Sequence, residues 1–454
     1  MSETLNKYLY PFKTKARRLS INILRSAMAI KISYVQKSSV KLLAKLIKLP
    51  DCGHAPEGGS ISIIAGGDVS FDTVVRSHPF FGVDGYIEVK RKPGILSRVE
   101  KRILNYFISQ HARNLAELPF RELMVKRPEN EQRKYLSKYY KEAVRFNPGP
   151  EDGFRYPFEK IAPLLKRMDL AIVNLETPLS DEKRAAGFFI SKPGYTKAIK
   201  GAGISLVSLA NNHIFDAGEK GFLDTIKHLE AAGIQYTGGG RNLEEARAGK
   251  RIQIKGSEIA FLSYTQWCIH RYASIAADYP GILPLDVGLM TEDILVAKMK
   301  VDLVFVCIHW GYENQPNVHP RQIEIAHTLI DAGADAIIGH HPHVPHGIEI
   351  YRNRPIFYSL GNFIFGQAQR NWVSDNFLAE IIIHDKTIKG VVIHPIAGRR
   401  EDLFQPRTVD GDRAIELLRD LQLKSLDFDT NICVSNSVGY IDISTHRESI
   451  ADII

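Results

Sequence analysis

The segment 307–363 constrains the fold most, because it places histidines at the ends of two predicted strands. The apolar run 301–308 ends at His309, and apolar residues at helical spacing over 322–332 separate it from a second apolar run at 334–338. Three histidines follow that second run: His340, His341 and His343. A strand, a helix and a second strand joined in this way put both strands parallel, so their carboxyl ends meet at one edge of the sheet. Open α/β sheets bind ligands along that edge.

The length and composition are those of a soluble globular protein with a large core. A chain of 454 residues can form two domains or one large domain with appendages, and 44% hydrophobic residues is ordinary. No two cysteines have CxxC spacing, which disfavours a disulfide framework or a thiolate zinc site and favours a reducing compartment. The cysteines are Cys52, Cys268, Cys307 and Cys433.

The basic charge is concentrated in residues 1–50, which hold eleven lysines and arginines against Glu3 alone. This segment therefore carries +10 and the rest of the chain −2, since the total is +8. We accordingly expect no nucleic-acid partner. The segment also lacks an apolar run long enough for a membrane span or a signal peptide. We expect a basic N-terminal helical extension over 1–58 and a cytoplasmic or peripheral membrane location.

Two basic segments each allow two interpretations. Residues 40–48 place apolar and lysine side chains on opposite helical faces, which fits a helix on an anionic membrane surface or a helix docked on the protein body. The segment 76–150 is an expected helical insertion that fits a polyanion-binding surface or a solvated amphipathic helix serving as a lid. The residues behind the polyanion interpretation are Lys134, Tyr135, Lys138, Tyr139, Tyr140 and Lys141.

Alternating strands and helices predict an α/β fold of two packed sheets between helical layers, in a domain covering 59–398. Early strands are expected at 60–65, 170–175, 205–209, 251–254 and 259–264, with a helix at 221–232. Later strands, expected to form a second and more antiparallel sheet, are at 348–351, 356–359, 377–383 and 388–394. Residues 399–454 are expected to form a small C-terminal segment with a helix at 412–423.

Side chains that can bind metals follow five of the predicted strands. They are Asp68, Glu176, Asn212 with His213, His309, and His341 with His343. Each alone has an ordinary explanation, such as a helix cap or a hydrogen-bonded histidine, but together at one sheet edge they indicate a site. Carboxylate, amide and imidazole donors suit manganese, iron or zinc, and the lack of thiolates disfavours a structural zinc.

The same residues suit a pair of divalent ions. Two ions a few ångströms apart repel each other and need a shared carboxylate, and such a pair can clamp the attacking and leaving oxygens of a phosphoryl or carbonyl group. His213 lies three residues before Asp216. We expect that carboxylate to orient His213 as a general acid.

Six motifs resemble those of the bacterial capsule-synthesis protein A (CapA) family, the poly-γ-glutamate synthesis proteins with a metallophosphatase-like fold. They are GGDVSFD, NLETPLS, SLANNHIFDAG, HWG, GHHPHV and IFYSLGNF, and the resemblance covers residues 60 to about 395 apart from the insertion. It implies a four-layer αββα sandwich of two mixed sheets and a two-metal site. The implied ligands are Asp68, Glu176 as the bridge, Asn212, His309, His341 and His343, with His213 as the catalytic histidine.

The chain departs from the wider metallophosphatase pattern at two positions. That pattern begins with Asp-x-His, whereas Asp68 is followed by Val69 and Ser70, and Glu176 stands where the wider superfamily has Asp. His340 is an additional donor, either to a metal or to a neighbouring ligand. The residues expected to line a substrate pocket are Asn211, His340 and Asn362.

The resemblance implies a hydrolase of the phosphoesterase type, which acts on an anionic polymer or a phosphorylated intermediate and meets a membrane complex for capsule synthesis. Two alternatives stay open. The missing histidine of the first motif favours a non-catalytic accessory subunit that binds a polyanion or a membrane synthase. The joint presence of Asn212, His213 and Asp216 favours the enzyme, and a stand-alone phosphodiesterase is the remaining alternative.

Overall fold

The computed structural model describes residues 49–50, 59–71, 153–182, 189–267, 278–365, 374–399, 402 and 405–443. The predictions for the basic segment 1–48 and for the insertion at 76–150 lie outside these residues. Among the helices that are described, none is both long and apolar enough to cross a membrane.

A large mixed sheet is built around β1 (Ile61–Ser70), which is parallel to β2 (Leu170–Leu175) and β13 (Asn362–Phe365) and antiparallel to β14 (Asn376–His384). Its strand order is β16-β17-β15-β14-β1-β2-β3-β4, and β13 pairs with the far part of β1. The remaining strands are β3 (Leu206–Ser208), β4 (Gln235–Thr237), β15 (Thr387–Ile396), β16 (Cys433–Ser435) and β17 (Val438–Asp442).

A smaller mixed sheet has the order β11-β12-β10-β9-β7-β6. Its core is the predicted strand–helix–strand unit, in which β9 (Leu303–His309) and β10 (Ala336–His340) are parallel and His340 lies opposite His309. The other strands are β6 (Lys250–Ile254), β7 (Ser257–Thr265), β11 (Ile348–Tyr351) and β12 (Arg354–Phe357), and β5 (Gly239–Gly240) forms a separate pair with β8 (Gly281–Ile282).

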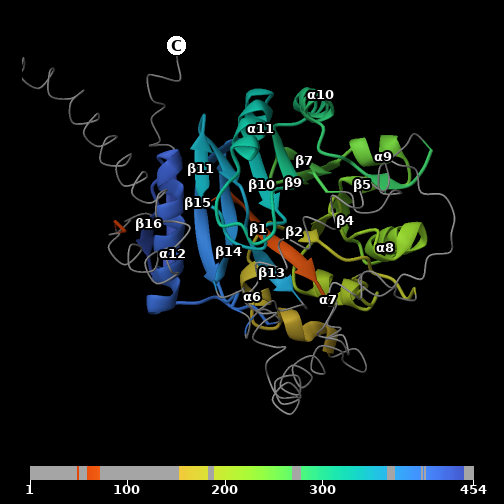
Figure 1. Ribbon diagram of the computed structural model, residues 1–454, viewed down its shortest axis with the longest axis horizontal. Helices are drawn as coiled ribbons and strands as arrows, with labels where there is room; N and C mark the ends of the chain where they lie inside the picture. The colour runs from red at the N-terminus through yellow and green to blue at the C-terminus, as the bar shows by residue number, and fades with distance from the viewer. Residues whose placement is uncertain are drawn as a thin grey trace, which may run out of the picture.

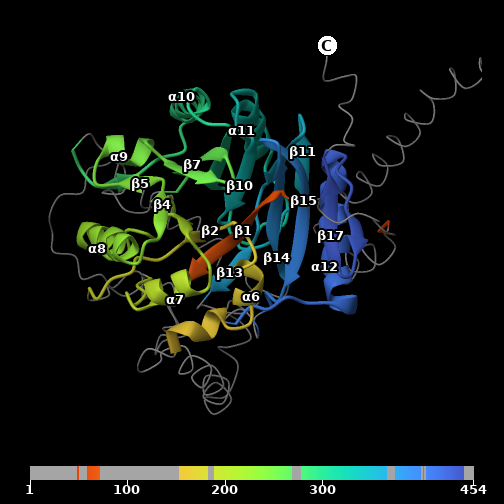
Figure 2. The ribbon, with the colours of Figure 1, turned by 180° about the vertical axis from the view of Figure 1, so that it is seen from behind.

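The two sheets face each other across a shared apolar core. Successive residues of β9 point alternately into this core and outward. Phe305 packs toward the large sheet with Ile63 and Ile172, and Val304 packs outward against helices. Both faces of β9 are therefore buried, which explains its continuous apolar run. The expected αββα layering is confirmed (Figures 1 and 2).

Helices cover both outer faces of this sandwich. On the smaller sheet lie α10 (Val287–Lys298) and α11 (Pro320–Asp331), and α11 begins at a capping box formed by His319 and Gln322. The large sheet is covered by η2 (Gly153–Phe158), α6 (Ala162–Leu165), α7 (Tyr195–Gly201) and α8 (Gly218–Ala231). The remaining helices are α9 (Leu243–Arg247), α12 (Gly411–Ser425) and η3 (Leu426–Phe428).

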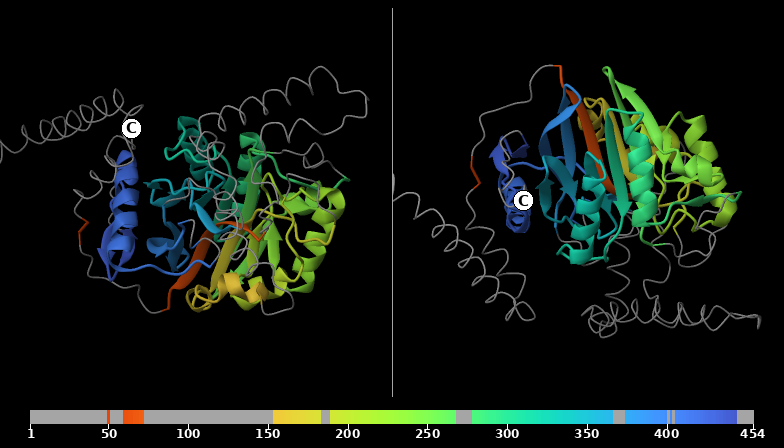
Figure 3. Two further views of the ribbon diagram at one scale, coloured as in Figure 1. Left: turned by 60° about the horizontal axis from the view of Figure 1, so that its bottom comes forward. Right: turned by 90° about the horizontal axis from the view of Figure 1, so that it is seen from above.

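The C-terminal elements belong to the same sheet system. β17 extends the large sheet by pairing with β15, and α12 buries Leu417, Leu418 and Leu421 in the core between the sheets. In both views of Figure 3 the dark blue α12 lies at the opposite end of the molecule from the green α8.

One prediction about sheet membership is wrong. The strands at 348–351 and 356–359 join the smaller sheet as β11 and β12, whereas those at 377–383 and 388–394 join the large sheet as β14 and β15. The four strands therefore do not form a second sheet of their own. Alternation of apolar residues reports that a strand is buried but not which neighbour it pairs with, and β14 pairs with β1 from the other end of the chain.

Candidate metal centre

The ligand-type residues converge where parallel strands of the two sheets end. Asp68 comes from β1, Glu176 follows β2, His309 ends β9, and His341 and His343 follow β10. All five are buried. They form two groups, Asp68 with Glu176 and His309, and Glu176 with His341 and His343, in each of which the ligand atoms lie within 4.8 Å of one another. Glu176 belongs to both groups.

Gly67 sets the position of Asp68. A Cβ atom at Gly67 would lie 1.8 Å from the carbonyl oxygen of Gly361, so no other residue allows β13 to approach β1 this closely. The Asp68 N–H donates to that same carbonyl at 3.1 Å. The close approach of the two strands at Gly67 thus positions the Asp68 carboxylate near the carboxyl end of β1.

The histidine turn after β10 has a strained backbone. His341 and His343 have φ angles of 96° and 58°, in the left-handed region that side chains other than glycine seldom adopt. The His341 N–H donates to Asp68 Oδ2 at 3.2 Å, and Asn314 N–H donates to the Pro342 carbonyl at 2.9 Å. These contacts hold the strained turn, and such strain in ordered proteins is concentrated at functional sites.

Asn174 connects the two sheets at the centre of the cluster. Its Nδ2 donates to Asp68 Oδ1 at 2.8 Å and lies 3.3 Å from His309 Nδ1 and 3.5 Å from Glu176 Oε2. Its Oδ1 accepts from Asn211 Nδ2 at 3.1 Å. One buried amide therefore touches three of the ligand-type residues and orients them.

Burial and close charges shift the pKa values in opposite directions. Burial acts to raise the pKa of Asp68, but His340 and His343 outweigh it and hold that pKa well below its usual value. Burial, and then the charge of Asp68, raise the pKa of Glu176 well above its usual value. Burial would lower the pKa of His343, but Glu176 and Asp68 raise it to about 10.

The other two histidines become harder to protonate. Burial, and next the nearby His341, lower the pKa of His309 well below its usual value. Burial also lowers the pKa of His341 to about 4. Neutral imidazoles offer the lone pairs that bind metal ions.

The hydrogen bonding shows that protein atoms alone do not satisfy this cluster. Among the described residues, eight buried side-chain atoms lack a hydrogen-bond partner, and five of them lie here. They are Ser70 Oγ, Glu176 Oε1, His340 Nδ1, His340 Nε2 and His341 Nδ1. Buried polar atoms are normally paired. This concentration of unpaired atoms fits bound cations, which would satisfy them.

His213 and Asp216 form an arm beside the cluster. His213 Nδ1 lies 2.8 Å from Asp216 Oδ2, the contact that the sequence predicts, and the Phe189 N–H donates to the same oxygen at 2.6 Å. The Phe189 ring lies against the imidazole with its centroid 4.1 Å away and its plane tilted by 31°. The His213 side chain is 15% exposed and that of Asp216 is 0%, so the imidazole reaches toward solvent from a buried base.

The remaining predicted residues also contact the cluster. Asn212 Oδ1 lies 2.8 Å from His309 Nε2, and Asn362 Oδ1 lies 2.9 Å from His343 Nδ1. Asn211 holds the turn after β3, since its Oδ1 accepts from the N–H groups of residues 213 and 214. His340 Nδ1 lies 3.5 Å from Asp68 Oδ1. The structure thus brings all the predicted site residues together.

Several residues around this cluster were not predicted from the sequence. Asn174 carries a signal, because it is the polar residue within the apolar run LAIVNL. Phe189 carries none, because it reaches His213 only through folding. On the other side, the Trp267 ring lies 5.7 Å from the His341 ring and 5.8 Å from that of Tyr312.

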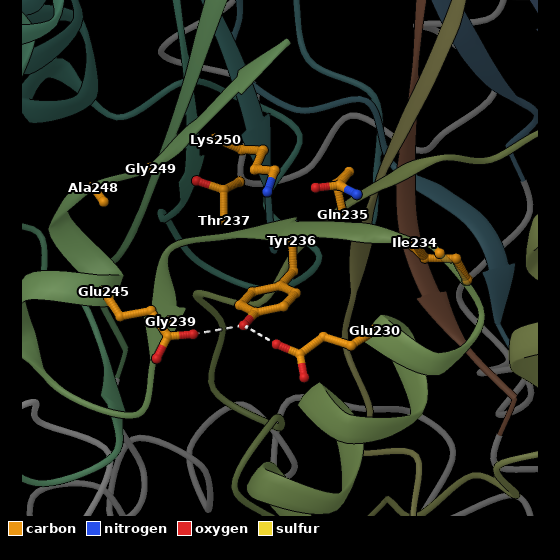
Figure 4. A pocket seen from close by; sticks show the side chains of 11 residues that line it. Glu230, Ile234, Gln235, Tyr236, Thr237, Gly239, Glu245, Ala248, Gly249 and Lys250 are labelled. Carbon is orange, nitrogen blue, oxygen red and sulfur yellow. Dashed lines mark hydrogen bonds between the residues drawn. The ribbon is translucent and has the colours of Figure 1, made fainter.

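A separate hollow of about 460 Å³ lies between the end of α8, β4 and α9 (Figure 4). In it, Tyr236 Oη lies 2.6 Å from Glu245 Oε1 and 3.1 Å from Glu230 Oε1. Burial, and then Glu245, raise the pKa of Tyr236, so the phenol stays protonated as a donor. None of its lining residues belongs to the histidine and carboxylate cluster, so the hollow is a different feature.

Curated relatives match about half of the chain. It is 37% identical over 229 residues to a capsule biosynthesis protein CapA of Bacillus anthracis, covering 48% of this chain and 55% of that protein. It is 35% identical to the PGA biosynthesis protein CapA of Bacillus subtilis (50% and 60%), and 32% identical to a probable polyglutamine synthesis accessory protein of Mycobacterium tuberculosis (50% and 64%). The chain therefore spans between half and two thirds of these relatives.

Solved structures are more distant. The NAD nucleotidase of Haemophilus influenzae has a TM-score of 0.34 and 14% identity, covering 58% of this chain and 49% of that one. The calcineurin-like phosphoesterase YfkN of Bacillus subtilis has a TM-score of 0.29 and 13% identity, covering 63% and 83%. Similarity at this level supports no argument about fold or function.

The family assignment rests on the sequence. Residues 124–367, more than half of the chain, match the model of the family described as bacterial capsule synthesis protein PGA_cap. That range contains Glu176, the motif with Asn212 and His213, and the histidine turn. The chain belongs to the bacterial capsule synthesis protein family.

Proposed function

We propose that this protein is a metal-dependent hydrolase of the phosphoesterase type that serves the synthesis of a capsule or poly-γ-glutamate. The observation that carries the proposal is the placement of Glu176, whose carboxylate is common to both potential ligand groups and whose Oε1 has no hydrogen-bond partner. A carboxylate shared in this way is what two neighbouring cations require.

The residues of the cluster divide between two ion positions. Asp68, Glu176 and His309 would hold one ion, with Asn212 beside His309, and Glu176, His341 and His343 would hold the other. Manganese, iron and zinc all accept oxygen and imidazole donors. A bound pair would polarise a phosphoryl oxygen and lower the pKa of water.

His213 would move the proton. Because Asp216 and the Phe189 ring fix the imidazole through Nδ1 and one face, Nε2 is the atom left to give a proton to a leaving oxygen. The buried carboxylate of Asp216 would stabilise the protonated ring until the proton is transferred. Asn211 and Asn362 would line the space where the substrate binds.

The substrate class follows from the relatives rather than from the pocket. The names of the curated relatives concern capsule, PGA and polyglutamine synthesis, so we propose an anionic polymer or a phosphorylated intermediate of its synthesis as the substrate. A membrane complex for capsule synthesis would be the partner. The basic residues 1–50 would contact it or an anionic membrane surface.

A second candidate function is a non-catalytic accessory subunit. Two observations favour it: Ser70 stands where the wider phosphatase pattern has a ligand histidine, and one relative is named as an accessory protein. In that case the cluster would bind ions for structural reasons, or it would bind none.

The test combines metal content with turnover. The full-length chain, purified without chelator, is assayed for metals by elemental analysis and for phosphodiester and phosphomonoester hydrolysis with added Mn²⁺. The variants are His213→Ala, His341→Ala and the control His327→Ala, whose imidazole pairs with Glu349 away from the cluster.

The hydrolase predicts about two ions per wild-type chain. His341→Ala should lose metal and activity together, whereas His213→Ala should keep the metal and lose roughly 10²- to 10⁴-fold in turnover. His327→Ala should retain both. Two ions without any turnover would favour the accessory subunit, and a metal-free, inactive wild type would contradict the proposed hydrolase.

A further inference from the structure

His340 lies in the cluster but belongs to neither of the two ligand groups described above. It is the last residue of β10, opposite His309 in register, and it is 1% exposed. Side chains alternate along a strand, so His340 shares the face of Ile338, which packs in the core between the two sheets. His340 therefore points toward the large sheet, where Asp68 lies.

The imidazole of His340 is buried without using either nitrogen. Neither Nδ1 nor Nε2 has a hydrogen-bond partner, and Nδ1 lies 3.5 Å from Asp68 Oδ1. Other buried histidines use at least one nitrogen: His309 contacts amides at both, and His346 uses Nε2, which lies 2.8 Å from the Gln315 carbonyl, while its Nδ1 has no partner. A neutral imidazole has one N–H and one lone pair to satisfy. Since no protein atom satisfies either one at His340, the ring has room for a bound partner from outside the protein.

The distance to Asp68 suits a shared ion. Two ligand atoms bound to one ion at about 2.1 Å lie roughly 3 to 4 Å apart, and the 3.5 Å between His340 Nδ1 and Asp68 Oδ1 falls in that range. Ser70, two residues after Asp68, also has a buried hydroxyl without a partner, but a neutral hydroxyl is a weak donor to a cation. Besides His309 of β9, His340 of β10 can therefore supply a further nitrogen donor at this position.

We propose that His340 is a metal ligand that completes the ion position of Asp68, Glu176 and His309. This inference rests on the proposed two-metal function and adds a fourth imidazole to the centre. It gives the position that lacks the first-motif histidine a nitrogen donor from a different strand. The alternative is that His340 only orients Asp68.

The test is Mn²⁺ binding, followed by the electron paramagnetic resonance signal of the free ion during titration of the metal-free, full-length chain. The variants are His340→Ala and His340→Gln, and the matched control is His346→Ala, another buried histidine. Circular dichroism and thermal melting confirm folding. Gln keeps a donor for Asp68 but lacks the imidazole, so it separates a ligand from an orienting residue.

The ligand role predicts two tight ions for the wild type and the control. Both His340 variants should keep one tight ion and bind the second at least about tenfold more weakly. Wild-type affinity for the second ion in either variant would overturn the inference while leaving the two-metal function intact. A wild type that binds no Mn²⁺ would instead refute the proposed function and this inference with it.

A second measurement does not depend on whether the variants fold. Pulsed electron paramagnetic resonance of the manganese-loaded wild type counts coordinated imidazole nitrogens. The inference predicts four, from His309, His340, His341 and His343. A count of three or fewer would overturn it.

Discussion

Two buried carboxylates with histidine neighbours, Glu176 and Glu349, differ in how they are satisfied. Glu349 Oε1 lies 2.9 Å from His327 Nε2, and its Oε2 accepts from Tyr358 Oη at 2.5 Å. Glu176 Oε1 has no hydrogen-bond partner and lies 3.8 Å from the Nε2 atoms of His309 and His343. Its Oε2 has only a 3.5 Å contact with Asn174. The same residue types thus make a closed network in one place and an open one in the other.

This difference separates a structural pair from a candidate binding site. Residue type and burial are alike at Glu176 and Glu349, so neither property identifies function. What differs is the set of unused donors and acceptors, together with the strained His341 and His343 backbones that hold them. Unsatisfied polar atoms are costly to bury, and they are retained where a ligand satisfies them.

The largest expected effect is that of Glu176→Gln on metal binding. Because both ligand groups share this carboxylate, the variant should bind Mn²⁺ more than about 100-fold more weakly at both positions. The metal-free variant should be at least as stable as the wild type, since it removes a buried carboxylate with an unused oxygen. Calorimetric titration and chemical denaturation measure the two effects, and unchanged metal affinity would contradict the shared role.

Asn174→Ala is expected to have the next largest effect. Loss of the amide that contacts Asp68, Glu176 and His309 should weaken Mn²⁺ binding roughly 10- to 100-fold, because groups that orient ligands contribute this much. The same titration measures it. Ser208→Ala, a buried position on β3 outside the cluster, is the control and should bind like the wild type. Equal affinity in Asn174→Ala would show that Asn174 only fills space in the core.

Glu349→Gln should behave in the opposite way to Glu176→Gln. It breaks a satisfied network with His327 and Tyr358, so the free energy of unfolding should fall by about 1–3 kcal/mol. Metal binding should not change. Urea denaturation of the metal-free proteins makes the comparison, and equal stability changes in the two variants would remove the distinction between open and closed networks.

The smallest effect concerns a second closed pair, Glu380 with His394, whose Oε2 and Nε2 atoms are 2.7 Å apart. Burial acts to raise the pKa of Glu380, but the bond to His394 outweighs it and the pKa is lowered. A lowered folded-state pKa stabilises the protein above the unfolded pKa, and this stability is lost as the pH falls through the folded value.

Glu380→Gln should therefore flatten the acid limb of the stability curve. Denaturation from pH 6 down to pH 3 should show a shallower loss of unfolding free energy in the variant than in the wild type. Superimposable slopes would show that the pair does not contribute to acid stability.

Much of the site could be predicted because the ends of apolar runs in the sequence indicate where strands end. The apolar runs before Glu176 and His309 end where β2 and β9 end, and parallel strands bring their carboxyl ends together. Asn174 was missed because it lies inside such a run, where the apolar pattern dominates. Phe189 and Trp267 approach the histidines only through tertiary packing, for which local spacing has no signal.

The same limit explains the error in sheet membership. β11 and β14 both show buried strand patterns, but β14 pairs with β1 across more than 300 residues of chain and β11 pairs with its neighbour β12. The unused nitrogens of His340 and the unused oxygen of Glu176 are likewise properties of the folded state. A sequence shows which donors exist, and the fold decides which of them remain unsatisfied.

Low-temperature electron paramagnetic resonance of the full-length chain loaded with two equivalents of Mn²⁺ tests directly whether Glu176 joins two ions. Because both ions would share Glu176, we predict an exchange-coupled manganese pair, lost in Glu176→Gln and kept in Glu349→Gln. Signals of isolated Mn²⁺ alone, or no bound Mn²⁺, would contradict a two-metal centre bridged by this carboxylate.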